Sequence, residues 1–229
     1  MNFNFHLDSP WLIADFDVPQ RMLSWSVTHP GFVEADQVAW LQVRDADLNQ
    51  DTDPVAFLRN KMTDMGLENA VGLMTSRDVQ HHHFQYAGIG KVNAGCLTTL
   101  GLHNASHAGF PEAGSDTTGP GTINSLCHVD VPLTDAAMVE AVSIIAQART
   151  AAMLHKGDGN NAQQVSGTGT DCIVLACPPK GEPSPYAGLH TDAGKALGQA
   201  VFRATLDARD EWLDKHGAPG SRAARVDTP

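Results

Sequence analysis

The sequence contains no run of 18 or more apolar residues, so we expect no membrane-spanning helix. Its first 17 residues carry Asp8, Asp15 and Asp17 and lack the basic and apolar regions of a secretory signal. Basic residues are also scarce: the sequence has 15 Lys and Arg and 26 Asp and Glu, which gives a formal net charge of −11. This excess argues against nucleic acid or an anionic membrane as the main partner and fits a neutral or cationic small molecule.

Cysteine is rare, and its spacing excludes the common two-cysteine metal motif. The four cysteines, Cys96, Cys127, Cys172 and Cys177, include no CxxC pair. Cys172 and Cys177 share one predicted strand, where their odd separation directs their side chains to opposite faces. We therefore expect buried free thiols and a cytoplasmic location.

The composition is that of a folded protein of ordinary size. Apolar residues make up 42% of the sequence and charged residues 18%, which allows a sizeable core. A length of 229 residues fits one domain, which we place at residues 1–217, followed by a loose tail at 218–229. We predict a single α/β domain in which two long helices pack on a mixed β-sheet.

Strand and helix signals alternate along the chain. The predicted strands are 11–17, 22–28, 37–43, 71–75, 91–100, 122–131 and 172–177. Asp53 and Pro54 begin a helix that Gly66 ends, and Thr134 caps the longest helix, at 135–155. Thr191 or Asp192 caps the last helix. Polar or Pro/Gly-rich loops are expected at 109–121, 156–164 and 178–185.

The most informative stretch is SGTGTD at 166–171, directly before the apolar run CIVLAC at 172–177. Its glycines let the backbone approach a bound group, while Thr168, Thr170 and Asp171 supply two hydroxyls and a carboxylate. An apolar run without alternation is typical of a strand buried on both faces. The pattern indicates a polar turn held at the start of a core strand, which is either a binding site or a plain tight turn.

The histidines give only weak metal signals. HHH at 81–83 is better explained as a solvated strand end, because alternation turns its middle residue away from its neighbours. His103 and His107 are four apart, on one face of a helical turn, but lack a neighbouring Glu and a third ligand. His190 precedes a helix N-terminus, whose dipole lowers a histidine pKa and favours a neutral imidazole, so it is either a base or a packing residue.

Five motifs in a fixed order resemble those of the adenosylcobinamide amidohydrolases of corrinoid salvage. They read GLHNA, PGTIN, LTDA, GTGTD and YAGLHT, at residues 101–105, 120–124, 133–136, 167–171 and 186–191, followed by Gly194 and Gly198. Each motif is weak by itself, but their order and separations also fit. The resemblance covers residues 71–208, whereas the first 70 residues are more particular to this chain.

The resemblance implies hydrolysis of the secondary amide that joins a corrin-ring carboxyl to aminopropanol or to its phosphorylated nucleotide-loop form. Adenosylcobyric acid would be released and could re-enter cobalamin synthesis. The corrinoid is then the substrate, and no cofactor or metal is expected. The expected partner is this small molecule, with no nucleic acid and no membrane, and self-association into a homo-oligomer stays open.

Site roles follow from the matching positions. We predict that Asp171 or His190 activates water, and that Asn104 and Asn124 hold the tetrahedral oxyanion. The predicted substrate-binding set is His103, Gly121, Thr122, Arg149, Gly167, Thr168, Gly169 and Thr170. A direct Asp171–His190 dyad is less favoured, because a strand of about 20 Å separates them at ~3.3 Å per residue. No Gly-x-Ser-x-Gly elbow is present, and a covalent Thr mechanism stays open.

Two stretches depart from the family pattern. A run like TEAK is expected in the long helix, but residues 146–149 read AQAR, so Arg149 keeps the basic charge while Gln147 replaces the acid. A run like GKHT reads GLHT at 188–191. If the missing acid were the general base, activity would be impaired or altered.

Two alternative functions therefore stay open. The chain could be a corrinoid-binding protein that releases no aminopropanol. It could also be a metal-dependent hydrolase with ligands among His81, His83, His103, His107 and His128.

Overall fold

The computed structural model describes residues 3–48, 51–109, 120–155 and 165–219. Most of the loop predicted at 109–121, the whole of the loop at 156–164 and most of the tail predicted at 218–229 lie outside these residues. The fold below is that of the described part of the chain.

The N-terminal half forms four strands and one helix. These are β1 (Phe3–Asp8), β2 (Trp11–Ser24), β3 (Gly31–Gln42), α1 (Pro54–Asp64) and β4 (Val71–Thr75), with a 3-10 turn at Asp45–Asp47 before α1. The Asp53 carboxylate caps α1 by accepting from the N–H groups of Val55 and Ala56, as Asp-Pro at a helix start predicts. Gly66 follows α1 with φ +69, the left-handed conformation that ends a helix.

The predicted strands 11–17 and 22–28 are instead one long strand, and β1 was not predicted. The register of β2 with β3 shifts between Asp15 and Gln20, so an irregular middle separates two regularly paired halves. The strand also ends at Ser24, earlier than predicted, and residues 25–30 connect it to β3. These differences come from pairing between distant segments, which a local pattern does not record.

The C-terminal half contains the remaining strands and the two long helices. These are β5 (His82–Ile89), β6 (Val92–Leu100), β7 (Ala105–Ser106), β8 (Ile123–Val129), α2 (Asp135–Leu154), β9 (Gly167–Thr168), β10 (Cys172–Cys177) and α3 (Asp192–His216). Thr134 caps α2, as predicted, and Thr191, one of the two caps predicted, caps α3. The prediction that α2 is the longest helix is wrong: α3 has 25 residues and α2 has 20. Buried residues continue along α3 as far as Trp212, and Gly217 follows its end.

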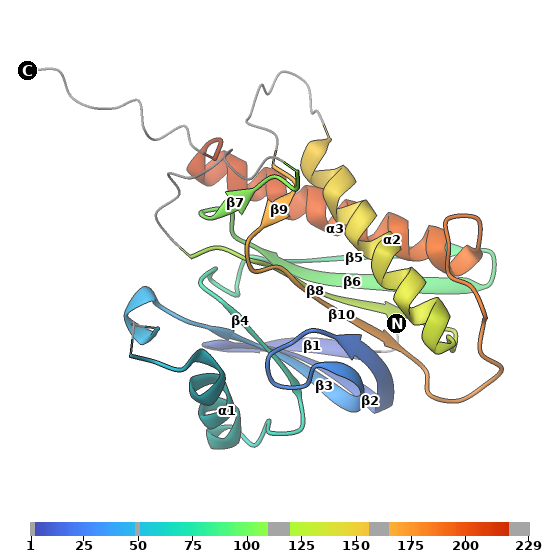
Figure 1. Ribbon diagram of the computed structural model, residues 1–229, viewed down its shortest axis with the longest axis horizontal. Coiled ribbons are helices and arrows are strands. Elements are labelled where there is room, and N and C mark those ends of the chain that lie inside the picture. The colour runs from blue at the N-terminus through green and yellow to red at the C-terminus, as the bar shows by residue number, and fades with distance from the viewer. Residues whose placement is uncertain (1–2, 49–50, 110–119, 156–164, 220–229) are drawn as a thin grey trace, which may run out of the picture.

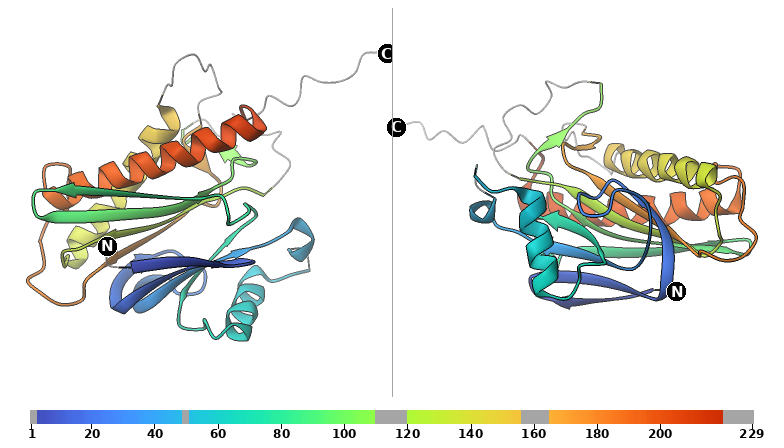
Figure 2. Two further views of the ribbon diagram at one scale, coloured as in Figure 1. Left: turned by 180° about the vertical axis from the view of Figure 1, so that it is seen from behind. Right: turned by 60° about the horizontal axis from the view of Figure 1, so that its bottom comes forward.

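One mixed sheet runs through the molecule in the order β4-β3-β2-β10-β8-β6-β5. β1 pairs with the N-terminal part of β2, residues 11–16. β10 pairs with β8 and β3 pairs with β4 in parallel, and the other pairs are antiparallel. The sheet bends so that β1–β4 lie beneath β5, β6, β8 and β10, with α2 and α3 above and α1 below (Figures 1 and 2). The predicted α/β fold with two long helices on a mixed sheet is confirmed.

Each interface between layers has its own apolar core. One core lies between the sheet and α2 and α3, a second between the two halves of the sheet, and a third under α1. The buried strand β10 contributes to the first two, with Cys177 in the upper core and Cys172 in the inner one. The predictions of opposite faces for this pair, and of four buried free cysteines, are confirmed.

Helix α2 is the one helix among the described residues that is long and apolar enough to cross a membrane. Such a finding is weak evidence, because the core helix of a soluble protein passes the same test. Here Met138 and Ile145 of α2 are fully buried in the core shared with α3 and the sheet. The buried Arg209 of α3 donates to the carbonyl oxygens of Ala152 and His155 and so caps the C-terminal end of α2.

Candidate active site

The turns after β6, before β8 and before β10 meet beside the ends of β2 and β4. Together they enclose a cavity of about 620 Å³ that opens to solvent. Asn104, Gly121, Thr122, Asn124, Gly169, Thr170 and Asp171, all predicted site residues, line it. The family-like motifs at 101–105, 120–124 and 167–171, far apart in the sequence, therefore share one pocket.

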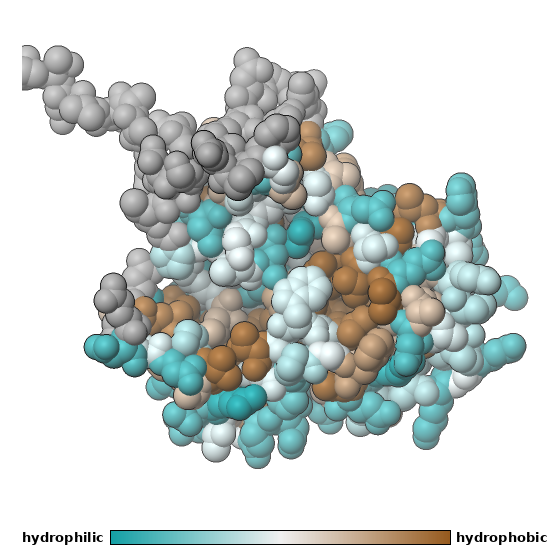
Figure 3. Space-filling model, viewed as in Figure 1, coloured by the Kyte–Doolittle hydropathy of each residue, from teal (hydrophilic) through white to brown (hydrophobic). Residues whose placement is uncertain are grey.

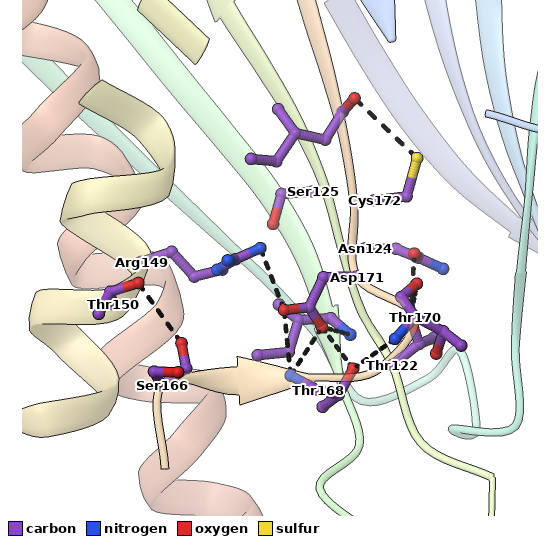
Figure 4. A network of polar contacts seen from close by, with 12 residues as sticks. Thr122, Asn124, Ser125, Arg149, Thr150, Ser166, Thr168, Thr170, Asp171 and Cys172 are labelled. Atoms are coloured by element: carbon purple, nitrogen blue, oxygen red, sulfur yellow. Dashed lines mark hydrogen bonds and ion pairs between the residues drawn. The ribbon is translucent and has the colours of Figure 1, made fainter. Parts of the chain in front are cut away.

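Asp171 is the centre of the polar network in this pocket (Figure 4). Its carboxylate accepts from the N–H of Ile123 at 3.1 Å, from the N–H of Thr168 at 3.1 and 3.2 Å, and from the Thr168 hydroxyl. Arg149 reaches it from α2, with Nη1 3.1 Å from Oδ2. The carboxylate thus joins β8, the 167–171 turn and α2.

These contacts change the roles predicted for three residues. Arg149, expected to bind substrate, forms a mostly buried ion pair with Asp171, whose side chain is only 9% exposed. The hydroxyl of Thr168, also expected to bind substrate, likewise donates to Asp171. For Asp171 to take a proton from water, one of its existing bonds would have to break, so the geometry favours a positioning role over a general base.

Glycine is needed at two positions because of close approaches. A Cβ at Gly121 would lie 2.7 Å from the carbonyl oxygen of Gly101 and 2.8 Å from Asn104 Oδ1. A Cβ at Gly167 would collide with the Asp171 carboxylate. Gly121 therefore lets two turns of the pocket touch, and Gly167 lets the carboxylate fold over its own turn.

Two threonine hydroxyls tie the turns together. The Thr122 hydroxyl donates to the carbonyl oxygen of Thr170 at 2.8 Å, and the Thr170 hydroxyl donates to that of Gly121 at 2.9 Å. Thr122 and Asn124 share a strand face, as predicted, with the Thr122 hydroxyl 3.3 Å from Asn124 Oδ1. These reciprocal bonds hold the pocket wall rigid before any ligand binds.

The two asparagines predicted to hold an oxyanion differ in whether their side-chain atoms are already hydrogen-bonded within the protein. Asn124 is buried, and its Nδ2 donates to the carbonyl oxygen of Met74 at 2.7 Å. Asn104 Oδ1 is a buried oxygen with no hydrogen-bond partner among the described residues. Buried polar atoms are nearly always paired, so Asn104 is the group of this wall with capacity for a ligand.

A second wall of the pocket is apolar and comes from the N-terminal half. It consists of Trp25, Val27, Val43, Leu48, Leu73 and Met74. In Figure 3 brown apolar side chains are exposed between the lower layer of strands and the turns above it. Sequence reasoning missed this wall, because it placed Trp25 and Val27 inside a regular strand.

Other predicted residues lie elsewhere. His190 is exposed in the turn before α3, where Thr191 caps the helix, and it is not among the residues that line the pocket. The structure therefore does not bring His190 to Asp171. His103 packs against Trp212 and His216 at ring distances of 5.5 Å, outside the pocket lining. Gln147, the family departure, is exposed on α2.

The histidines considered as metal ligands are dispersed. His81 and His83 pair with Glu211 on α3, and His128 is buried against Phe3 and Phe16. His103 and His107 are not on one helical turn, because β7 begins between them. Within the described ranges, no group of three or more His, Cys, Asp or Glu has the geometry of a metal site.

Cys172 is the thiol that lines the pocket. Burial raises its pKa to about 11, although hydrogen bonds from Ser24 and from the backbone at Trp25 oppose the shift. The reactive form of cysteine is the thiolate, which burial disfavours here, so the surroundings of Cys172 do not activate it as a nucleophile.

The comparisons with known proteins agree with the motifs. A model of the adenosylcobinamide amidohydrolase family, CbiZ, matches residues 2–217, so the match extends through the first 70 residues as well. An adenosylcobinamide amidohydrolase of Halobacterium salinarum is 33% identical over 140 residues, 58% of this chain and 57% of that protein. One of Methanosarcina mazei is 29% identical over 171 residues, 69% of this chain and 77% of that protein.

Likeness to solved structures is more distant. The PH0078 protein from Pyrococcus horikoshii OT3 aligns with 86% of this chain and 76% of its own, at a TM-score of 0.43 and 12% identity. The match to the Halobacterium protein spans little more than half of that protein's length. Because the family model covers nearly the whole sequence, the chain belongs to the adenosylcobinamide amidohydrolase (CbiZ) family.

Proposed function

We propose that this chain hydrolyses the amide bond between the corrin ring and aminopropanol in adenosylcobinamide or a related corrinoid. Water is consumed, the carbon–nitrogen bond breaks, and the products are the ring carboxylate, as in adenosylcobyric acid, and the free amine. Family membership and the relatives that carry this activity in their names support the proposal.

The observation that carries the proposal is the convergence of three motif segments on one pocket that holds a free amide group. Asn104 has a buried Oδ1 without a partner, next to turns fixed by Thr122 and Thr170. An asparagine side chain accepts from an N–H through its oxygen and donates to a carbonyl through its nitrogen. Asn104 can therefore hold a substrate amide, with Oδ1 accepting from its N–H and Nδ2 donating to its carbonyl oxygen and to the oxyanion that forms there.

The other motif residues keep this wall in place. Asp171, with Arg149 behind it, fixes the 167–171 turn, and Asn124 fixes the end of β4 through Met74. A pre-formed arrangement of this kind lowers the cost of ordering polar groups when the transition state forms. These residues act as positioning residues, and Asn104 is the residue proposed to touch the reacting amide.

A second function, binding of a corrinoid without hydrolysis, is favoured by one observation. Asp171 is the one carboxylate among the described residues that line the pocket, and its oxygens are already occupied. If no group accepts a proton from water, the same pocket would hold the corrinoid and release no amine. The experiment must therefore measure binding and turnover separately.

The test is to incubate the purified protein with adenosylcobinamide and to follow adenosylcobyric acid and aminopropanol by mass spectrometry, with and without EDTA. We expect both products in both samples. Products that disappear with EDTA would indicate a metal-dependent mechanism. Tight binding without products would support a corrinoid carrier. The absence of both binding and products would overturn the assignment to corrinoids.

The matched variants are Asn104→Ala in the pocket and Gln147→Ala on the exposed face of α2. Removal of one oxyanion donor costs about 10²–10³ in kcat in other enzymes, so Asn104→Ala should be nearly inactive. Gln147→Ala should turn over like the unmodified protein. If Asn104→Ala keeps full turnover with an unchanged unfolding curve, the proposed role of Asn104 is wrong.

A further inference from the structure

Trp25 differs from every other tryptophan of the chain. Trp11, Trp40 and Trp212 are at most 3% exposed, whereas Trp25 is 48% exposed at the rim of the pocket. An indole is a large apolar surface, and leaving it half exposed forgoes much of the free energy that its burial would give. Exposure of this kind at a pocket indicates a surface that a ligand covers.

The ring of Trp25 is also held in place. Its indole N–H donates to the carbonyl oxygen of Asp171 at 2.8 Å, across 146 positions of sequence. The exposed indole is thereby fixed beside the turn that carries the Asp171 network. A side chain already fixed before binding loses less conformational entropy when a ligand packs on it.

The surroundings of Trp25 select the kind of ligand. Val27, which is 47% exposed, lies two residues away, and both belong to the apolar wall of the pocket. The wall with Asn104, Thr122 and Thr170 is polar. A ligand that fits both walls carries a hydrogen-bonding amide on one part and a flat apolar ring on another.

We propose that Trp25 is a specificity-determining residue that packs face-on against a planar conjugated ring of the substrate. This inference rests on the proposed function, because it assumes a corrinoid in the pocket. Two parts of adenosylcobinamide have the required chemistry, namely the corrin ring and the adenine of the adenosyl group. Stacking against either one positions the amide toward Asn104.

The test measures Kd for the unmodified protein, Trp25→Ala and Trp25→Phe by equilibrium dialysis. The probes are adenosylcobyric acid, which lacks the aminopropanol amide, and diaquacobyric acid, in which water replaces the adenosyl group. Tyr186→Ala is the control, because Tyr186 is an exposed aromatic residue that does not line the pocket. KM and kcat for adenosylcobinamide are measured on the same four proteins.

Removing an aromatic platform costs on the order of five- to 100-fold in affinity in base-stacking sites. We expect Trp25→Ala to raise Kd for adenosylcobyric acid, and KM, by about tenfold or more with little change in kcat. Trp25→Phe keeps a ring but loses the N–H, so its Kd should stay within about threefold. An equal loss with diaquacobyric acid would place the corrin ring on Trp25, and a loss confined to the adenosyl form would place adenine there.

Three results would overturn the inference. If Trp25→Ala binds like the unmodified protein, Trp25 is not a platform. If Trp25→Phe loses as much affinity as Trp25→Ala, or if both lose kcat while Kd is unchanged, the residue acts through its bond to Asp171. Failure of the unmodified protein both to bind these corrinoids and to hydrolyse adenosylcobinamide would instead overturn the proposed function.

Discussion

Two carboxylates of this molecule, Asp171 and Glu211, each accept bonds from several donors, yet they belong to different kinds of network. Asp171 is 9% exposed and bonded to backbone N–H groups, a hydroxyl and Arg149. Glu211 is 27% exposed and is bonded to the side chains of His81, His83 and Lys215, at 2.8, 2.6 and 2.6 Å. The number of partners is similar, but burial and the type of partner are not.

The difference separates a carboxylate that holds backbone segments in place from one that pairs mainly with side chains near the surface. Backbone donors cannot move away from Asp171 without breaking β8 or the 167–171 turn, so this network determines the shape of the pocket. Three partners of Glu211, namely His81, His83 and Lys215, are 22–44% exposed side chains that water can partly replace, and the buried Arg77 lies farther away, at 3.8 Å. The comparison therefore predicts large effects at Asp171 and small ones at Glu211.

The largest effect is expected from Asp171→Asn. This change leaves the guanidinium of Arg149 mostly buried without its counter-charge, which costs about 3–5 kcal/mol in comparable buried pairs. Urea unfolding measures the loss. The double variant Asp171→Asn/Arg149→Met should recover part of it, because the unpaired charge is gone, and a coupling free energy near zero would contradict the buried pair.

A buried histidine, His128, that forms no ion pair among the described residues extends the comparison. Burial lowers the pKa of His128 from 6.5 to about 4, although nearby Asp130 opposes the shift. His128 is thus neutral in the folded protein while the unfolded chain takes up a proton below pH 6.5. Stability is complete above that pH and should fall by about 3 kcal/mol between pH 7 and pH 4.

The measurement is the free energy of unfolding of the unmodified protein and of His128→Gln between pH 7.5 and 4. The variant should lose most of this slope whatever its stability at pH 7. Ile145→Val is the control, because Ile145 is fully buried in the separate core under α2 and does not titrate. It should lower stability equally at every pH, and an unchanged slope in His128→Gln would show that other groups cause the pH dependence.

Glu211→Gln is expected to cost about 1–2 kcal/mol at pH 7, less than the roughly 3 kcal/mol that its shift in pKa alone would give, because water screens these partly exposed ion pairs. Burial alone would raise the pKa of Glu211, but hydrogen bonds from Lys215 and His83 and the charges of His81 and His83 lower it from 4.5 to about 2. Its contribution is therefore present above pH 4.5 and lost as the pH falls toward 2. A cost at pH 7 as large as that of Asp171→Asn would refute the comparison.

The sequence predicted best those features that depend on neighbouring residues. Asp53 and Pro54 marked the start of α1, Thr134 and Thr191 were correctly placed as caps, and the apolar run at 172–177 became the buried strand β10. In each case the decisive contact lies within a few residues of the signal, or the pattern itself reports burial. Motif order also identified the family without any structure.

What the sequence could not show depends on contacts between distant segments. Trp25 reads as a strand residue, but its indole N–H bonds to the Asp171 carbonyl, and β2 ends before it. Arg149 reads as a substrate ligand because the family pattern has a basic residue there, but it pairs with Asp171. His190 belongs to a motif, yet it lies in the turn that leads into α3. Shared motifs therefore did not establish that their residues share a site.

The smallest effect is expected from Gln147→Glu, which adds a carboxylate outside both networks and restores the acid of the family-like TEAK pattern. Gln147 is exposed on α2 and does not line the pocket, so a charge there is screened by water and does not reach the reacting amide. We expect hydrolysis of adenosylcobinamide within about twofold of the unmodified protein, measured as initial rates of aminopropanol release, with Gln147→Lys as the control of opposite charge.

A strong gain with Glu and none with Lys would show that an acid at this position takes part in the reaction. The catalytic centre would then have to include the exposed face of α2, and the distinction between a carboxylate that shapes the pocket and one that lies on the surface would fail.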